Sequence, residues 1–105
     1  MIEYKILREL EKNPDSTQRT LAGKLDVSLG KINYVLTGLI KKGIIKAQKL
    51  KNDPQNIRWN YLLTPQGIQE KVQITKNYLE NRLNEFDKIQ REIDELKREM
   101  VENNP

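Results

Sequence analysis

The polar residues best suited to bind a partner are concentrated in residues 28–42. Asn33 can form the pair of hydrogen bonds that suits the edge of an adenine, and Lys31 can donate to guanine or to a phosphate. Tyr34 can contact a thymine methyl group or a phosphate. If this stretch is helical, spacings of three and four residues place most of these side chains on one side. The candidate contact residues here are Ser28, Gly30, Lys31, Asn33, Tyr34, Thr37, Lys41 and Lys42.

Apolar residues of the same stretch occupy the opposite side of the predicted helix. They fall within one arc at about 100° per residue, as expected for a helix whose inner face packs in a core. The polar face is then available to a partner, and its residue types suit the major groove of double-stranded DNA. The residues of the apolar arc are Ile32, Val35, Leu36, Leu39 and Ile40.

A shorter helix precedes this one and is predicted to end near Leu25. Asp15, Ser16 and Thr17 are candidate N-caps, and Gln18 is spaced to pair with Asp15 in a capping box.

A tight turn at Asp26-Val27 joins the two helices. Asp26 stands where glycine is usual and tolerates left-handed backbone geometry, Ser28 caps the following helix, and the small Ala22 allows the helices to approach closely. These features predict a helix-turn-helix. The alternative is an ordinary helical hairpin inside a core, but the polar face and the basic charge favour a DNA-binding motif.

A third helix and a hairpin flank this motif. Residues 2–12 form an amphipathic helix that ends at Asn13-Pro14, because a residue before proline is pushed out of helical geometry. After Gly43, residues 44–50 and 57–63 are predicted strands that make a wing. Ile57, Trp59, Tyr61 and Leu63 share one face of the second strand. Outside the predicted helix at residues 28–42, the candidate contacts to phosphates or the minor groove are Arg19, Lys46, Lys49, Lys51, Asn52 and Arg58.

Thr64 and Pro65 begin a long helix, as its N-cap and its first residue. Gly67 falls in the first turn, where glycine costs little. Nothing breaks the helix before residue 103, a length of about 58 Å. A seven-residue apolar repeat predicts a coiled coil between two copies of the chain. The predicted dimer-interface residues are Val72, Leu79, Leu83, Phe86, Ile89, Ile93, Leu96 and Met100.

Charges beside the repeat favour a parallel pair. Glu92 would then face Lys97 of the other copy, whereas an antiparallel pair would bring glutamates together. The alternative is a helix that folds back on its own domain, and the strict seven-residue repeat argues against it.

Composition excludes most catalytic chemistry. The chain has no Cys and no His among its 105 residues, so no catalytic residue, metal site or cofactor is predicted and an enzyme is not expected. No apolar run approaches the roughly 18 residues of a membrane span, so we expect a soluble, cytoplasmic protein that does not bind membranes. Residues 1–63 carry 12 Lys or Arg against 6 Asp or Glu, and residues 64–105 carry 7 against 9. The first part is therefore predicted to face a polyanion.

The stretch TQRTLAGKLDVSLGKINYVLTGLIKKGIIK, with LLTPQG after the wing, resembles the winged-helix repressors of the MarR type. SLGKINY is most similar to their subgroup of EPS-associated regulators, named for an occurrence with exopolysaccharide genes. The resemblance implies a bacterial or archaeal homodimer whose recognition helices enter successive major grooves, with the wings beside them.

Two features depart from that family. Larger MarR proteins build their dimer interface, and often a small-ligand pocket, from additional terminal helices, so a small-molecule effector is not predicted for a chain with one long helix. Their wing usually carries Asp-x-Arg, and the arginine is absent at Asp53-Pro54-Gln55. Arg58 and Lys51 are the candidates to replace it.

The sequence thus predicts a mainly α fold with a small β-hairpin. A winged helix-turn-helix DNA-binding domain occupies residues 1–63, and a long dimerisation helix occupies residues 64–105. The predicted function is a homodimeric, sequence-specific transcriptional regulator. One alternative is a protein–protein interaction module with a coiled-coil tail. The other is RNA binding, which the narrow major groove of A-form RNA disfavours.

Overall fold

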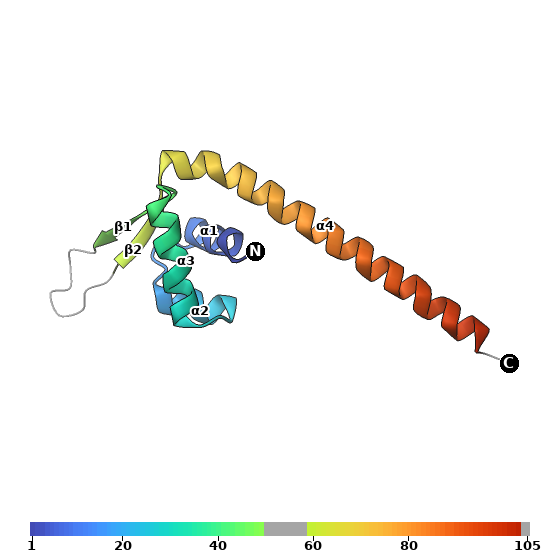
Figure 1. Ribbon diagram of the computed structural model, residues 1–105. Coiled ribbons are helices and arrows are strands. Elements are labelled where there is room, and N and C mark those ends of the chain that lie inside the picture. The colour runs from blue at the N-terminus through green and yellow to red at the C-terminus, as the bar shows by residue number, and fades with distance from the viewer. Residues whose placement is uncertain (50–58, 104–105) are drawn as a thin grey trace. The chain divides into compact units, whose positions relative to one another are not determined.

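The computed structural model describes residues 1–49 and 59–103, and its elements are labelled in Figure 1. It is mainly helical with one antiparallel hairpin, as predicted. The chain divides into two compact units, Met1–Thr75 and Lys76–Pro105. The elements in order are α1 (Ile2–Lys12), α2 (Gln18–Leu25), α3 (Leu29–Lys41), β1 (Ile45–Lys49), β2 (Trp59–Leu63) and α4 (Pro65–Glu102).

The start of α2 is fixed by two threonines. Thr17 Oγ1 accepts from the Thr20 backbone N–H at 3.2 Å, and Thr20 Oγ1 accepts from the Thr17 N–H at 2.8 Å. This reciprocal capping box gives hydrogen-bond acceptors to two backbone N–H groups that have no partner within the helix. The predicted pairing of Asp15 with Gln18 is therefore wrong, because α2 begins at Gln18. The Gln18 side chain is left for other contacts.

The turn between α2 and α3 has the predicted geometry. Asp26 is left-handed, with φ 54° and ψ 48°. Two residues later, Ser28 Oγ accepts from the Lys31 backbone N–H at 3.1 Å and caps α3. Because α2 and α3 pack on the same core, this turn holds α3 with one face inward and one outward.

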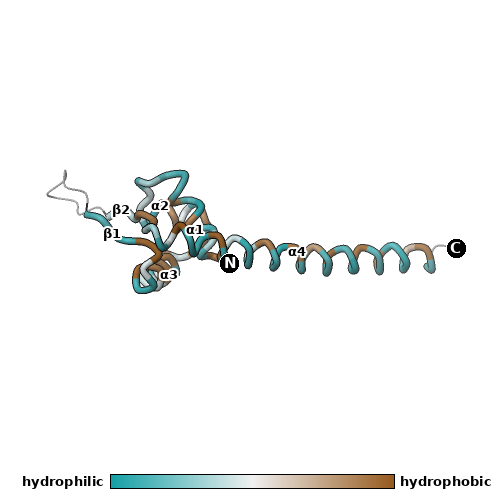
Figure 2. The backbone as a smooth tube through the Cα atoms, turned by 90° about the horizontal axis from the view of Figure 1, so that it is seen from above, coloured by the Kyte–Doolittle hydropathy of each residue, from teal (hydrophilic) through white to brown (hydrophobic). Residues whose placement is uncertain are grey.

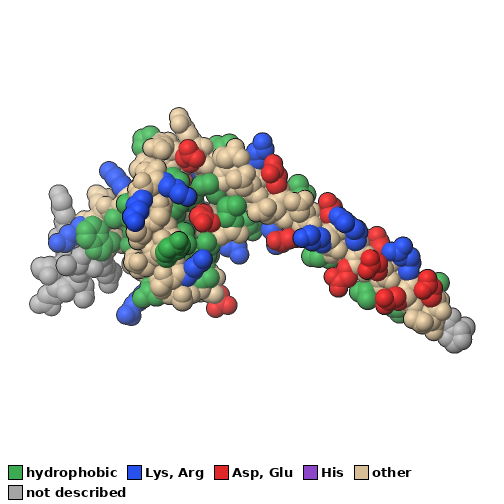
Figure 3. All heavy atoms as spheres, in the orientation of Figure 1, with side chains coloured by type: hydrophobic (Ala, Val, Ile, Leu, Met, Phe, Trp, Pro, Cys, Tyr) green, Lys and Arg blue, Asp and Glu red, His purple; other side chains and the backbone are tan. Residues whose placement is uncertain are grey.

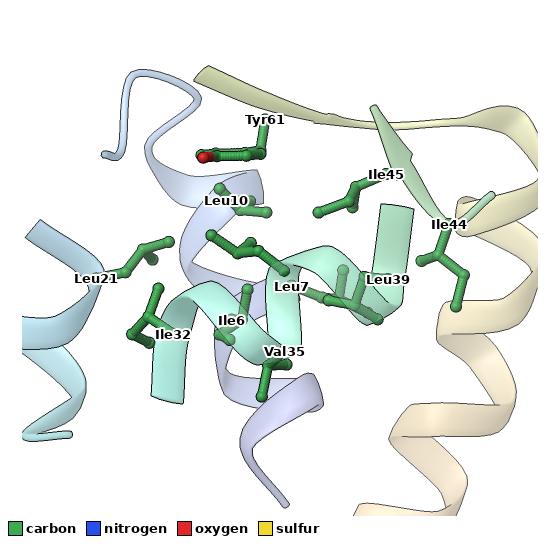
Figure 4. Close-up of a cluster of buried hydrophobic side chains, with 11 residues drawn as sticks. Ile6, Leu7, Leu10, Leu21, Ile32, Val35, Leu39, Ile44, Ile45 and Tyr61 are labelled. Atoms are coloured by element: carbon green, nitrogen blue, oxygen red, sulfur yellow. The ribbon is translucent and has the colours of Figure 1, made fainter. Parts of the chain in front are cut away.

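The core of the first unit is built from all three short helices and the hairpin (Figure 4). From α3, Ile32, Leu36 and Leu39 are at most 2% exposed. Ile40 was predicted to be buried with them, but its exposed fraction is 39% because it lies at the edge of the apolar arc. The buried core residues are Ile6, Leu7, Leu10, Leu21, Ile32, Val35, Leu36, Leu39, Ile44, Ile45 and Tyr61.

The wing strands pair antiparallel, from Ile45 opposite Leu63 to Lys49 opposite Trp59. Burial along β2 does not follow the two faces of the strand. Tyr61 is buried, but Trp59 on the same face is 45% exposed because the core ends before it. Asn60 on the other face is 8% exposed, so simple alternation fails here. Ile57 lies outside the described residues.

Gly43 lies between α3 and the hairpin, and Thr64 lies between the hairpin and α4. Gly43 ends the α3 segment with φ 74°, a left-handed conformation that favours glycine. The Thr64 backbone N–H donates to the Ile44 carbonyl at 3.0 Å. Thr64 Oγ1 accepts from the Gly67 N–H at 2.9 Å, which confirms Thr64 as the N-cap.

Gly67 is required where it lies. A Cβ atom built on it would stand 1.9 Å from the Ile44 carbonyl oxygen, and that oxygen belongs to backbone. The sequence predicted only that glycine costs little in this first turn, and the structure adds that no side chain fits at Gly67. Its absent side chain lets α4 pass close to the segment that leads into β1.

The second unit is the continuation of α4 from Lys76. Apolar and polar segments alternate along it in Figure 2, and acidic and basic side chains are interspersed in Figure 3. Within this stretch Arg82 and Glu85 form an ion pair at 2.8 Å. Among the described residues, none of the helices is both long and apolar enough to cross a membrane.

Candidate nucleic-acid interface

The outer face of α3 is exposed along its whole length. Tyr34 has an exposed fraction of 76%, the largest among the big apolar side chains that the structure describes in the first unit. Aromatic side chains usually bury much of their area, so this residue lacks a packing role in the single chain. The other predicted contact residues of α3 that are also exposed are Gly30, Lys31, Asn33, Thr37 and Lys41, with Ser28 and Lys42 exposed at its two ends.

Several of these residues share one surface. Tyr34, Thr37, Lys41 and Lys42 line an open depression beside α3, together with Glu3 of α1 and the buried residues Val35 and Leu39. Figure 3 shows Lys and Arg side chains over this part of the molecule. The fold therefore brings an aromatic ring, a hydroxyl and two cations onto one side of the helix.

Two glycines of α3 face open space. No other atom lies within 4 Å of a Cβ built on Gly30 or Gly38. In the described part of the chain, neither glycine is therefore needed to let another helix cross α3 closely. Each costs roughly 1 kcal/mol of helix propensity relative to alanine, and close approach of an outside partner would account for that cost.

The flanking cations lie on other elements. Arg19 is exposed in the first turn of α2, and Lys46 and Lys49 are exposed on β1. Arg19 lies next to Gln18, whose amide accepts a hydrogen bond from Asn33 of α3. The start of α2 therefore adjoins the outer face of α3. The predicted wing residues Lys51, Asn52 and Arg58 lie outside the described residues.

Two residues of this surface were missed from the sequence. Gln18 bridges α2 to α3 and to β2 through its amide. Trp59 is exposed at the end of β2 opposite Lys49, so the two side chains share a face of the wing. The exposed Trp59 could have been anticipated only by knowing where the core ends. The role of Gln18 could have been suspected from the Thr17 and Thr20 capping box, which leaves its side chain free.

The predicted coiled-coil residues are all exposed in the single chain. Ile93 is the least exposed at 40%, and Met100 reaches 75%. In the parts of the chain that the structure describes, there is no cluster of three acidic, His or Cys residues able to hold a metal ion.

Residues 2–46 match the family model described as winged helix-turn-helix DNA-binding. The helices α1 to α3 and the antiparallel wing match that architecture in space. The protein has a winged helix-turn-helix fold. A comparison with curated proteins gave no match.

Solved structures share this winged helix-turn-helix architecture. The protein smu.1704 from Streptococcus mutans UA159 matches with a TM-score of 0.71 and 22% identity, over 85% of this chain and 86% of that one. Streptococcus pneumoniae FabT, solved in complex with DNA, matches with a TM-score of 0.58 and 20% identity, over 95% and 74%. A MarR protein from Peptoclostridium difficile matches with a TM-score of 0.61 and 21% identity, over 96% and 67%. At these identities the likeness establishes the shared fold.

Proposed function

We propose that this protein is a transcriptional regulator that binds double-stranded DNA as a homodimer. The observation that carries the proposal is the outer face of α3, where Tyr34 is 76% exposed among polar and cationic neighbours. The family match to winged helix-turn-helix DNA-binding domains supports it. So does the likeness to FabT, a protein that has been solved with DNA bound.

In this proposal α3 lies in the major groove. Ser28 caps its N-terminus, leaving Lys31 and Asn33 one turn further on to reach base edges. The open space at Gly30 and Gly38 lets the helix backbone approach the groove closely. Tyr34 and Thr37, with Lys41, extend the contact along the exposed side of the helix.

Phosphate contacts come from the elements around α3. Arg19 and Lys42 lie exposed at the start of α2 and the end of α3, where they can hold the DNA backbone on either side of the groove. Lys49 extends the cationic surface to the wing, beside the exposed indole of Trp59. Lys51, Asn52 and Arg58 are also proposed to contact DNA. These groups add affinity without specifying sequence.

We propose that dimerisation uses α4, with residues 64–105 as the dimerisation segment and 1–63 as the DNA-binding segment. The predicted dimer-interface residues form an exposed apolar seam along α4. In this proposal a second copy of this chain covers the seam in parallel orientation. Glu92 then faces Lys97 of that copy, and Glu85 faces Gln90. Arg82 lies seven residues before Ile89 and so occupies a core position of the repeat. It is paired with Glu85 on its own helix, which lowers the cost of placing a cation there.

A two-fold dimer implies a two-fold operator. Two recognition helices on one side of the DNA require half-sites about one helical turn, roughly 34 Å, apart. We propose exopolysaccharide genes as targets on the basis of the SLGKINY resemblance alone. Genome-wide mapping of bound sites tests that assignment separately from DNA binding itself.

Selection from random DNA is the experiment that tests the function. We expect an enriched, pseudo-palindromic site that gives both the sequence and the half-site spacing. With about six phosphate contacts per dimer, affinity for duplex DNA should fall by roughly a thousandfold between 50 and 200 mM salt. No enriched site, or binding that does not respond to salt, would reject the proposal and favour a protein partner for this basic face.

Base contacts and phosphate contacts should respond differently to mutation. Asn33→Ala and Tyr34→Ala should relax sequence choice, with a loss of about 1–3 kcal/mol that is confined to particular base pairs. Lys49→Ala should weaken binding to all sequences alike and make the salt dependence less steep. Competition titrations with the selected site and single-base variants measure both effects. The same uniform loss from all three variants would show that the base contacts are assigned wrongly.

A further inference from the structure

A chain of side-chain hydrogen bonds runs from the core to the outer face of α3. Gln18 Nε2 donates to the Tyr61 hydroxyl at 3.1 Å, and Asn33 Nδ2 donates to Gln18 Oε1 at 3.4 Å. Tyr61 is only 5% exposed, whereas Asn33 is exposed. In Figure 4 the Tyr61 ring lies over Leu10, with its hydroxyl on the side where α2 lies. The inner end of the chain is therefore held by the core.

Gln18 is free to make these bonds because it has no part in starting α2. Thr17 and Thr20 cap the helix with each other's hydroxyl groups and backbone N–H groups. The amide of Gln18 can therefore use its donor on Tyr61 and its acceptor on Asn33 at once. This arrangement connects α2 and α3 to β2, which lies far from both in the sequence.

The bond from Gln18 decides what Asn33 presents outward. With Nδ2 turned to an acceptor, Asn33 keeps its Oδ1 acceptor and one N–H donor for a partner. That pair complements adenine, whose N7 accepts and whose N6 amino group donates. While Gln18 donates to the Tyr61 hydroxyl, rotating the Asn33 amide by half a turn would set its oxygen against the Gln18 oxygen, and two facing acceptors repel.

We propose that Gln18 is a specificity-determining positioning residue, which holds the Asn33 amide in the orientation that prefers adenine. This inference rests on the proposed function, since it assumes that Asn33 contacts a base. Gln18 acts through Asn33 and need not contact DNA itself. Its effect is on the choice between bases, while the overall affinity comes from the cations around α3.

Two variants of similar size separate this role from a general structural one. Gln18→Glu keeps an acceptor facing Asn33, so the adenine preference at the contacted base pair should be retained even if overall affinity falls. Gln18→Met removes the acceptor, and that preference should drop about tenfold. Both are measured as the ratio of affinities for adenine and guanine at the position identified by Asn33→Ala. Thermal unfolding of both variants shows that the fold is kept.

A double-mutant cycle tests whether Gln18 acts through Asn33. In the Asn33→Ala background, Gln18→Met should cause no further loss of base preference. An unchanged preference in the Gln18→Met single variant would overturn the proposal. So would a loss in Gln18→Glu as large as that in Gln18→Met, since Gln18 would then be acting as a donor. If Asn33→Ala left every base preference intact while the wild-type protein bound its site, this inference would fail and the proposed function would stand.

Discussion

Replacing Ile93 with Asp is expected to convert the protein to a monomer and to weaken binding to its selected site by at least about 100-fold. Ile93 is at the centre of the most regular part of the seven-residue repeat, and it has the lowest exposed fraction of the seam in the single chain, 40%. In a parallel dimer the two carboxylates introduced by Ile93→Asp would be buried against each other, and each loses hydration without gaining a partner.

The loss of DNA affinity follows from the loss of the second half-site. When two recognition helices are joined, the second binds at a high effective concentration, which contributes about 10²- to 10⁴-fold to the overall affinity. Sedimentation measures the mass, and fluorescence anisotropy with labelled operator measures the affinity. Asn84→Asp is the matched control, because it adds the same side chain to the opposite face of this exposed helix. An Ile93→Asp protein that keeps the mass of a dimer would rule out this seam.

Gly67→Ala is expected to destabilise the first unit by about 3 kcal/mol, near the upper end of the usual cost of overpacking. The added methyl carbon would lie 1.9 Å from the Ile44 carbonyl oxygen and 2.9 Å from its carbonyl carbon. Both are backbone atoms, so no side-chain rotation can relieve the contact. The start of α4 must move away, which strains the bonds from Thr64 to the Ile44 carbonyl.

Thermal unfolding followed by circular dichroism measures this effect. For a domain of this size, about 3 kcal/mol corresponds to a fall in the melting temperature of roughly 12–24 °C. Gly23→Ala is the matched control: Gly23 lies within α2, and no atom lies within 4 Å of its built Cβ. That change should raise stability by roughly 0.5–1 kcal/mol through helix propensity. Equal melting temperatures for Gly67→Ala and the wild type would contradict the close approach.

The segment from Asp26 to Gly43 shows how far short-range information extends. Residue types predicted Ser28 as a cap, Asp26 as a left-handed turn residue and Gly43 as a helix stop, and all three are confirmed. These features depend on backbone geometry within a few residues, which side-chain chemistry controls locally. The apolar period likewise predicted the buried face of α3, because a helix repeats its faces every 3.6 residues.

The edges of that face were decided by packing. Ile40 lies within the predicted apolar arc, yet it remains 39% exposed because the core is narrower than the arc. Trp59 continues the buried face of β2 in sequence, but the core ends before it. Periodicity gives the direction of a side chain and carries no information about how far the neighbouring elements extend.

The sequence by itself determined the helices, the caps of α3 and α4, the turn, the wing strands and the outward position of Lys31, Asn33 and Tyr34. Tertiary structure alone decided three contacts between residues far apart in the chain. Gln18 meets Asn33 and Tyr61, which are 15 and 43 residues away. Gly67 meets the Ile44 carbonyl, which belongs to the segment before β1. Local preferences act over a few residues, whereas these contacts exist only once the helices and the hairpin have closed around a common core.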